Sequence, residues 1–179
     1  MGYALATAAM GLGAEVILVS GPVSLEPPGG ARMVYAGSAL QMRTAVKKHS
    51  GRADILVFAA AVCDYRPRRF SREKIKSVKN TMTVSLVKNP DIIREAGLKK
   101  GKRIVVGFAL ETGGLVKNAK KKMKEKNADL MVANPAGNLE AGSGSAVIIS
   151  RNGEITRAGK RSKQALSRLI MRKVAGLTG

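Results

Sequence analysis

A run of seven apolar residues, Ile55 to Ala61, is the feature that most constrains how this chain can fold. An uninterrupted apolar run of this length is typical of a strand that is buried on both faces of an α/β sheet. The run ends abruptly at Asp64, Pro67 and a basic segment that extends to Lys76, and a central strand does not tolerate proline. Ligands of open α/β sheets bind at the carboxyl ends of the strands. The residues after Ala61 therefore mark the place where a small-molecule site is expected.

Strand and helix patterns alternate along the rest of the chain. Strands are predicted at 15–20, 33–35, 82–87, 104–109 and 129–134, and helices at 2–12, 38–48, 89–97, 112–126 and 162–174. The helix N-caps are predicted to be Ser38, Asn89, Thr112 and Ser162. The sequence Asn152-Gly153 between two short apolar runs is a strong signal for a β-hairpin. The pattern predicts one α/β domain over residues 1–179: a three-layer, Rossmann-like fold with a mostly parallel sheet and an antiparallel C-terminal hairpin.

Basic residues greatly outnumber acidic ones. The chain has 32 Lys plus Arg against 12 Asp plus Glu, which gives a formal net charge of +20. Such an excess attracts polyanions, and charge alone does not separate nucleic acid from an anionic membrane or from phosphorylated metabolites. Aromatic residues make up only 3% of the chain, and there is no Trp, so few side chains could stack on bases. A basic α/β domain that binds nucleic acid without catalysis is therefore the alternative to an enzyme acting on small anions.

The chain has the features of a cytoplasmic protein. Its single cysteine, Cys63, cannot form an internal disulfide, which favours a reducing compartment. No apolar run approaches the 18 or more residues of a membrane span. The first segment has no basic region ahead of its apolar residues, so no secretory signal is predicted and no membrane partner is expected.

The common catalytic fingerprints, such as a P-loop or paired metal ligands, do not occur in the sequence. Asp64 and Lys74 are the best chemical pair: the carboxylate could bind a sugar hydroxyl, a base amino group or a hydrated metal, and the lysine could close over a phosphate. A solvated basic loop explains the same residues equally well. Lys122 and Lys126 are four residues apart on one helix face, so they could bind an anion between them or form part of a solvated lysine helix.

Seven segments occur in order along the chain: GYALA at 2–6, VSGPVSL at 19–25, AAVCDYR at 60–66, EKIK at 73–76, VKNPDI at 87–92, VGFALET at 106–112 and DLMVAN at 129–134. Together they resemble the synthetase domain of the phosphopantothenoylcysteine synthetase/decarboxylase family of coenzyme A biosynthesis. The resemblance covers nearly the whole chain. It implies ligation of L-cysteine to 4′-phosphopantothenate through an acyl-nucleotide (acyl-CMP) intermediate, with CTP or ATP as co-substrate and Mg²⁺ as cofactor.

The resemblance also implies roles for individual residues. Lys74 would be the lysine of a flap that stabilises the transition state and contacts the nucleotide, and Ala61 and Asn134 would contact the substrate. The metal ligands are not assigned. The nucleotide site would be formed by Phe58, Ala59, Ala60, Asp64, Pro90, Asp91, Ile92, Ile93, Phe108, Lys122 and Lys126. The choice between CTP and ATP would depend on backbone contacts near Phe58 and in 90–93.

The sequence departs from the family pattern in three places. The family has a strand, a Gly-rich turn and an asparagine ahead of the segment that starts at Met1, so we expect an N-terminally truncated domain with impaired activity when tested alone. Pro135 stands where the family commonly has Asp, and residues 136–145 form a simplified, Gly-rich loop. No flavin-binding decarboxylase domain is recognisable, so FMN is not expected, and such a domain would be encoded on another chain or upstream. By resemblance we expect a homodimer.

Overall fold

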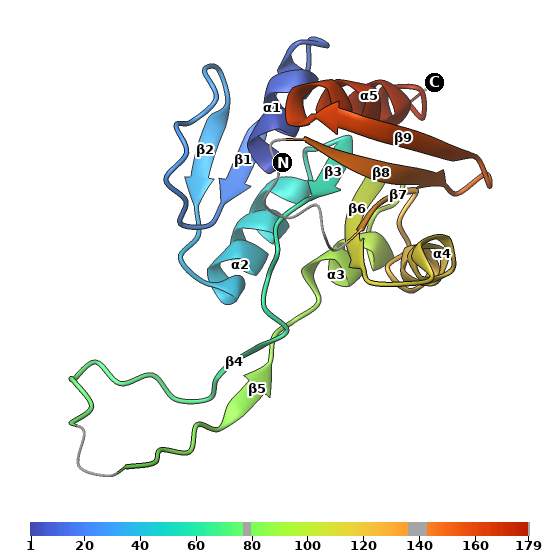
Figure 1. Cartoon of the computed structure of the whole chain (residues 1–179). Coiled ribbons are helices and arrows are strands. Elements are labelled where there is room, and N and C mark those ends of the chain that lie inside the picture. Colours follow the sequence, from blue (N-terminus) through green and yellow to red (C-terminus); the bar gives the residue numbers. More distant parts are fainter. Residues whose placement is uncertain (77–79, 136–142, 179) are drawn as a thin grey trace.

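The computed structural model describes residues 1–76, 80–135 and 143–178 (Figure 1). Helices and strands alternate through most of the chain. The helices are α1 (Gly2–Met10), α2 (Ala39–Ser50), α3 (Ile92–Leu98), α4 (Leu115–Glu125) and α5 (Lys163–Ala175). The strands are β1 (Ile17–Ser20), β2 (Arg32–Tyr35), β3 (Ile55–Phe58), β4 (Tyr65–Pro67), β5 (Leu86–Lys88), β6 (Ile104–Glu111), β7 (Leu130–Pro135), β8 (Ser143–Ser150) and β9 (Ile155–Ser162).

A five-stranded mixed sheet in the order β3-β6-β7-β8-β9 forms the centre of the fold. Strands β3, β6 and β7 are parallel, whereas β7 to β9 are antiparallel and end in the hairpin predicted around Asn152-Gly153. Strands β1 and β2 form a separate parallel pair. The predicted α/β class and the antiparallel C-terminal hairpin are therefore confirmed.

Helices cover both faces of the central sheet, as a three-layer fold requires (Figure 1). Residues of α1 and α5, including Leu5 and Ile170, pack with Val106 on one face, whereas Met123 of α4 packs with Val105 on the other. Val105 and Val106 are both fully buried, because successive side chains of a strand point to opposite faces. This double burial explains why the strand at 104–109 is a continuous apolar run.

The strand starting at Ile55 is shorter and less buried than predicted. It ends at Phe58 rather than Ala61, and its four residues are only half-buried. The reason is its place in the sheet, since β3 is the edge strand and pairs only with β6 among the described residues. The fully buried central position belongs to β6 and β7 instead.

Two of the four predicted helix caps are wrong. Ser38 and Ser162 cap α2 and α5 as expected, because each side chain accepts a hydrogen bond from the backbone N–H three residues on. Helix α3 is capped by Asp91 rather than Asn89, whose side-chain amide makes other contacts. Helix α4 begins after Gly114 instead of Thr112, and the φ of 59° at Gly114 is a conformation that favours glycine.

Strands β4 and β5 form the base of a long excursion that we call the flap, residues 65–76 and 80–88. Tyr65 pairs with Lys88 and Pro67 with Leu86, and beyond this antiparallel ribbon the segment projects away from the rest of the protein (Figure 1). The predicted strand at 82–87 is therefore largely wrong: only 86–88 is a strand, and Met82 and Val84 are 66% and 51% exposed. An alternating pattern without a partner strand is not sufficient to form a ladder.

Two further observations concern the chain as a whole. Within the described ranges, no helix is long and apolar enough to cross a lipid bilayer. Most of the predicted Gly-rich loop, residues 136–142, lies outside the described residues.

Candidate functional site

The carboxyl ends of β3, β6 and β7 lie side by side, at the place where the sequence predicts a site. Phe58 is opposite Gly107, and Leu110 is opposite Asn134. The fold thus brings Phe58, Phe108 and Asn134 to one edge of the sheet. Their side chains are nevertheless divided, because Phe58 packs on the α4 face and Phe108 on the α1 and α5 face. A ligand at this edge would contact their backbone rather than both rings.

The segment that follows β3 is open to solvent. Ala60, Ala61 and Asp64 are exposed, and Ala59 is partly buried. Small side chains leave the backbone accessible, so a flat or sugar-like ligand can approach its N–H and C=O groups here. Asp64 lies between the end of β3 and the flap, which begins at the next residue.

Asp91 connects two elements of the site. One carboxylate oxygen accepts a hydrogen bond of 3.1 Å from the backbone N–H of Arg94, which caps α3, and the other is bound by the ammonium of Lys126. Lys126 is at the C-cap of α4, where the helix dipole favours a cation. The predicted nucleotide-binding residues Asp91 and Lys126 are therefore in direct contact.

The two isoleucines that follow Asp91 have a packing role. Ile92 is buried, and Ile93 packs so closely over Gly107 that a Cβ added to this glycine would lie 2.8 Å from the Ile93 Cδ1 atom. Pro90 and Asp91 are half-buried. If residues 90–93 contact a nucleotide, Ile92 and Ile93 contribute through their backbone.

Glu111, at the end of β6, is a site residue that the sequence analysis missed. Its side chain is 9% exposed, and Lys122 Nζ lies 2.8 Å from its Oε1 atom. Asn118 donates to Oε2 at 3.1 Å. The hydrogen bond from Lys122 holds the pKa of the Glu111 carboxyl below its usual value, although burial acts in the opposite direction. The signal that could have found Glu111 is its position directly after the apolar strand at 104–109.

Lys122 and Lys126 thus each have a carboxylate partner near the carboxyl edge of the sheet, rather than an anion shared between them. A hollow of about 220 Å³ lies beside the contact of Lys122 with Glu111 and is lined by Glu111, Asn118, Lys121, Lys122 and Glu125. Two lysines and two carboxylates line the hollow, so a phosphate bound there would compete with Glu111 for Lys122, and a phosphate at Lys126 would compete with Asp91. The arrangement can bind a polyanion next to the strand ends.

The structure does not bring Lys74 to the other predicted site residues. Lys74 is exposed and lies in the flap, which projects away from the sheet edge (Figure 1). A transition-state role for this lysine stays a prediction.

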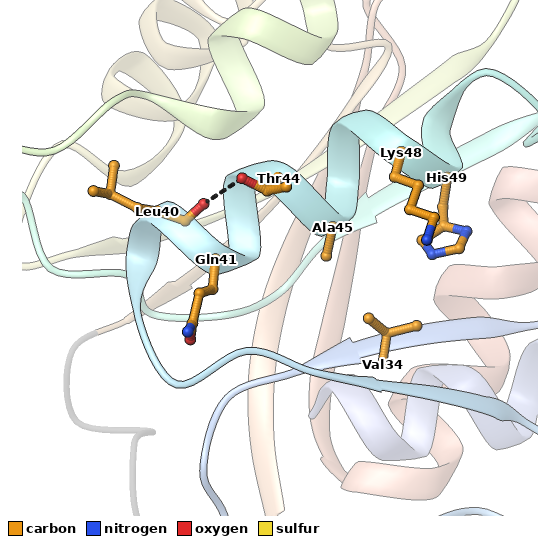
Figure 2. Close-up of a pocket in the computed structure, with 7 residues that line it drawn as sticks. All are labelled: Val34, Leu40, Gln41, Thr44, Ala45, Lys48 and His49. Carbon is orange, nitrogen blue, oxygen red and sulfur yellow. Dashed lines mark hydrogen bonds between the residues drawn. The ribbon is translucent and has the colours of Figure 1, made fainter.

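A second hollow, of about 360 Å³, lies between β2 and α2 (Figure 2). It is lined by Val34, Leu40, Gln41, Thr44, Ala45, Lys48 and His49. The Thr44 hydroxyl donates a hydrogen bond to the Leu40 carbonyl within its own helix. None of the predicted site residues lines this hollow. It lies at the two-stranded sheet, away from the carboxyl ends of β3, β6 and β7.

Across the described residues, no group of three or more His, Cys, Asp or Glu side chains could hold a metal ion. The described residues therefore fit Mg²⁺ only as nucleotide-dependent enzymes commonly bind it: the ion is held by substrate phosphates, by water and by one or two carboxylates of the protein. Asp64 is exposed at the strand end and could supply one such carboxylate.

Comparison with known proteins identifies the family of the chain. Residues 1–177 match the family described as "DNA/pantothenate metabolism flavoprotein C-terminal domain". The coenzyme A biosynthesis bifunctional protein CoaBC of Bacillus subtilis is 41% identical over 183 residues, covering 99% of this chain and 45% of that protein. The crystal structure of a CoaBC C-terminal domain has a TM-score of 0.83 and 35% identity, covering 97% of this chain and 79% of the other.

A more distant neighbour is a Cab2 mutant in complex with phosphopantothenate-cysteine, with a TM-score of 0.62, 19% identity and coverage of 82% of this chain and 52% of the other. At this identity the likeness shows the fold alone. The chain spans about half the length of the curated relatives that it matches. From the match over residues 1–177 and the 41% identity to CoaBC, we conclude that this chain belongs to the family of DNA/pantothenate metabolism flavoprotein C-terminal domains.

Proposed function

We propose that this domain is a phosphopantothenate–cysteine ligase of coenzyme A biosynthesis, which uses CTP as co-substrate. The observation that carries the proposal is the placement of Lys122 against Glu111 at the carboxyl end of β6, with Lys126 four residues further on and bound to Asp91, so that two ammonium groups can bind a triphosphate. Two comparisons support it. A relative that matches 99% of this chain is named for coenzyme A biosynthesis, and a protein of the same fold binds phosphopantothenate-cysteine.

The proposed reaction has two steps. The carboxylate of 4′-phosphopantothenate attacks the α-phosphorus of CTP, and pyrophosphate leaves with the electrons of the broken P–O bond. The amine of L-cysteine then attacks the carbonyl carbon of the acyl-CMP, CMP leaves, and the amine loses a proton to form the amide. Both steps move negative charge onto phosphate oxygens, so fixed cations are the main catalytic requirement.

The residues divide into three groups by their proposed task. Lys122 and Lys126 bind the triphosphate, and Lys74 contacts the phosphoryl group as charge develops on it. Ala61 and Asn134 contact the pantothenate substrate. The nucleoside is held by the segment from Phe58 to Ala60, by Asp64, by residues 90–93 and by the backbone near Phe108. Mg²⁺, when bound, would neutralise phosphate charge, with Asp64 as the candidate protein ligand.

We also propose that the domain acts in the cytoplasm as a homodimer. Large apolar side chains are exposed on the flap, including Phe70, which is 88% exposed, and Tyr65, Ile75, Met82, Val84 and Leu86. Contact with a second copy would bury this apolar surface.

The test is a chimera in which this chain replaces its counterpart in the Bacillus subtilis relative. We expect the chimera to form phosphopantothenoylcysteine and release pyrophosphate with CTP, and to lose this activity when both Lys122 and Lys126 are changed to Met. An exposed pair on α4, Lys120→Met with Lys124→Met, is the matched control, because it removes the same charge at the same four-residue spacing from other helix faces. A chimera that folds and binds CTP but makes no product would refute the ligase assignment.

The nucleic-acid alternative has a different signature. Duplex binding would fall steeply with the logarithm of the salt concentration and would not discriminate between nucleoside triphosphates. Preference for CTP over ATP in a calorimetric titration, retained at 0.2 M salt, is the result expected for the ligase.

A further inference from the structure

Asn89 is a buried polar residue at the base of the flap, and it is only 9% exposed. Its side-chain Nδ2 donates to the carbonyl of Cys63 at 2.8 Å, and its backbone N–H donates to the carbonyl of Asp64 at 2.7 Å. These two bonds tie the strand that leaves the flap to the segment that enters it. Asn89 therefore joins the two ends of the flap at its base, immediately beyond the last residue pair of the β4–β5 ribbon.

A second group of contacts comes from Arg66 of β4. Its Nη1 donates to the carbonyl of Lys88 at 2.9 Å and to Oδ1 of Asn89 at 3.1 Å. Both ends of the Asn89 amide are thus in use, with the oxygen facing a guanidinium and the nitrogen facing a carbonyl. This environment selects an amide: aspartate would place a carboxylate oxygen against the Cys63 carbonyl, and leucine would remove both the hydrogen bond to that carbonyl and the one from Arg66.

The same short segment reaches the lysine helix. Two residues after Asn89, the Asp91 side chain caps α3 and binds Lys126 at the end of α4. Asn89 and Asp91, separated only by Pro90, thus connect the base of the flap to the helix that presents Lys122 and Lys126. The fixed φ of proline leaves little freedom between the two connections.

We propose that Asn89 is a positioning residue: it fixes the direction in which the flap leaves the sheet edge and thereby the position from which Lys74 approaches the reacting phosphoryl group. This inference rests on the proposed ligase function and extends it, because it assigns the placement of Lys74 to a residue that contacts neither nucleotide nor substrate. A misplacement of about 1 Å in a catalytic group can cost about 100-fold in rate. Asn89 therefore affects the rate of pyrophosphate release, through Lys74, and does not affect the affinity for CTP.

The first arm of the test does not depend on activity. The chain contains no Trp, so Phe70→Trp places a single fluorophore on the exposed part of the flap. We expect Asn89→Ala and Asn89→Asp to increase the fast depolarisation of this fluorophore while amide protection in β6 is unchanged. Asn152→Ala, in the hairpin turn distant from the flap, is the matched control and should leave the anisotropy as it was. Unchanged anisotropy in both Asn89 variants would overturn the proposal.

The second arm separates positioning from a merely structural role. In the chimera with the Bacillus subtilis relative, we expect Asn89→Asp to slow pyrophosphate release by about 10- to 100-fold while the Kd for CTP changes by less than about two-fold. Adding Asn89→Asp to Lys74→Met should then cost less than about three-fold more, because Asn89 acts only through the lysine that is already absent. If the two effects multiply, Asn89 acts independently of Lys74 and the proposal is wrong. If the chimera without these substitutions has no turnover, the ligase assignment fails, and the anisotropy alone decides whether Asn89 orders the flap.

Discussion

Gly97, in the last turn of α3, is the position where a single methyl group should do most damage. A Cβ added there would lie 1.9 Å from the carbonyl oxygen of Lys126 and 3.3 Å from the Cβ of Asn127. Asn127 also donates its side-chain amide to the Gly97 carbonyl at 2.7 Å. Helix α3 and the end of α4 are therefore in backbone contact, and Gly97→Ala must push them apart by roughly 1.5 Å to restore ordinary van der Waals separation.

The expected cost follows from three effects. Forcing extra volume into a packed contact costs about 1–3 kcal/mol, and the upper end applies because the opposing atom is backbone rather than a flexible side chain. Loss of the Asn127 hydrogen bond adds about 1 kcal/mol. The better helix propensity of alanine returns about 1 kcal/mol. We expect a net loss of about 3 kcal/mol in the free energy of unfolding, or roughly 6–12 °C in Tm for a chain of this size.

Chemical denaturation followed by circular dichroism measures this loss directly. Gly51→Ala is the matched control: Gly51 has φ −65° and ψ −21° after α2, and a Cβ there meets nothing within 4 Å. Its stability should be unchanged or slightly raised, by up to about 1 kcal/mol. If Gly97→Ala is as stable as Gly51→Ala, the close contact between α3 and α4 is not a feature of the folded protein, and the placement of Lys126 beside Asp91 loses its support.

Three further predictions concern the charged groups. Lys122 lowers the pKa of Glu111 in the folded state, so the ionised carboxylate stabilises the protein above its ordinary pKa of 4.5, and this stability is lost as the pH falls through the lowered pKa. Lys122→Met should therefore move the midpoint of acid unfolding to higher pH. An unchanged midpoint would show that the contact does not stabilise the fold. Lys126→Met should weaken CTP binding by about ten-fold or more in a calorimetric titration, since it removes a charge-assisted contact, while Lys124→Met, on another face of α4, should change it by less than about two-fold. In the chimera, Lys74→Met should slow acyl-nucleotide formation by about 100- to 1,000-fold in a rapid-quench assay, with little change in CTP affinity. Equal losses in the rate and in CTP affinity would show that Lys74 contributes to binding of the ground state instead.

The order and type of most elements could be predicted, because apolar runs and turn residues are local signals. The hairpin at Asn152-Gly153 and the caps at Ser38 and Ser162 depend only on neighbouring residues, and all three are confirmed. The cap of α3 was predicted wrongly because Asn89 and Asp91 have nearly equal local preference. The choice between them is made by Cys63 and Arg66, which are more than 20 residues away in sequence.

The sequence indicated where a candidate site would lie, but not which side chains would contact one another there. Strand ends and helix faces indicated Asp64, Lys122 and Lys126, since these follow from periodicity. The carboxylates that bind the two lysines could not be deduced, because their contacts depend on how α4 packs over β6 and α3. The position of Lys74 depends in the same way on the path of the flap, which no local pattern encodes.

The separation of β1 and β2 from the central sheet has a consequence for how the protein responds to ionic strength. Among the described residues, β1 and β2 are not hydrogen-bonded to the five-stranded sheet, and side chains provide the connection. Tyr3 on α1 bonds the Ser20 hydroxyl at 3.0 Å, and Arg43 on α2 binds Glu95 on α3 at 2.8 Å. Exposed ion pairs contribute at most about 1 kcal/mol and are screened by salt. We therefore expect the β1–β2–α2 region to open before the central sheet, and to do so more readily as the salt concentration rises.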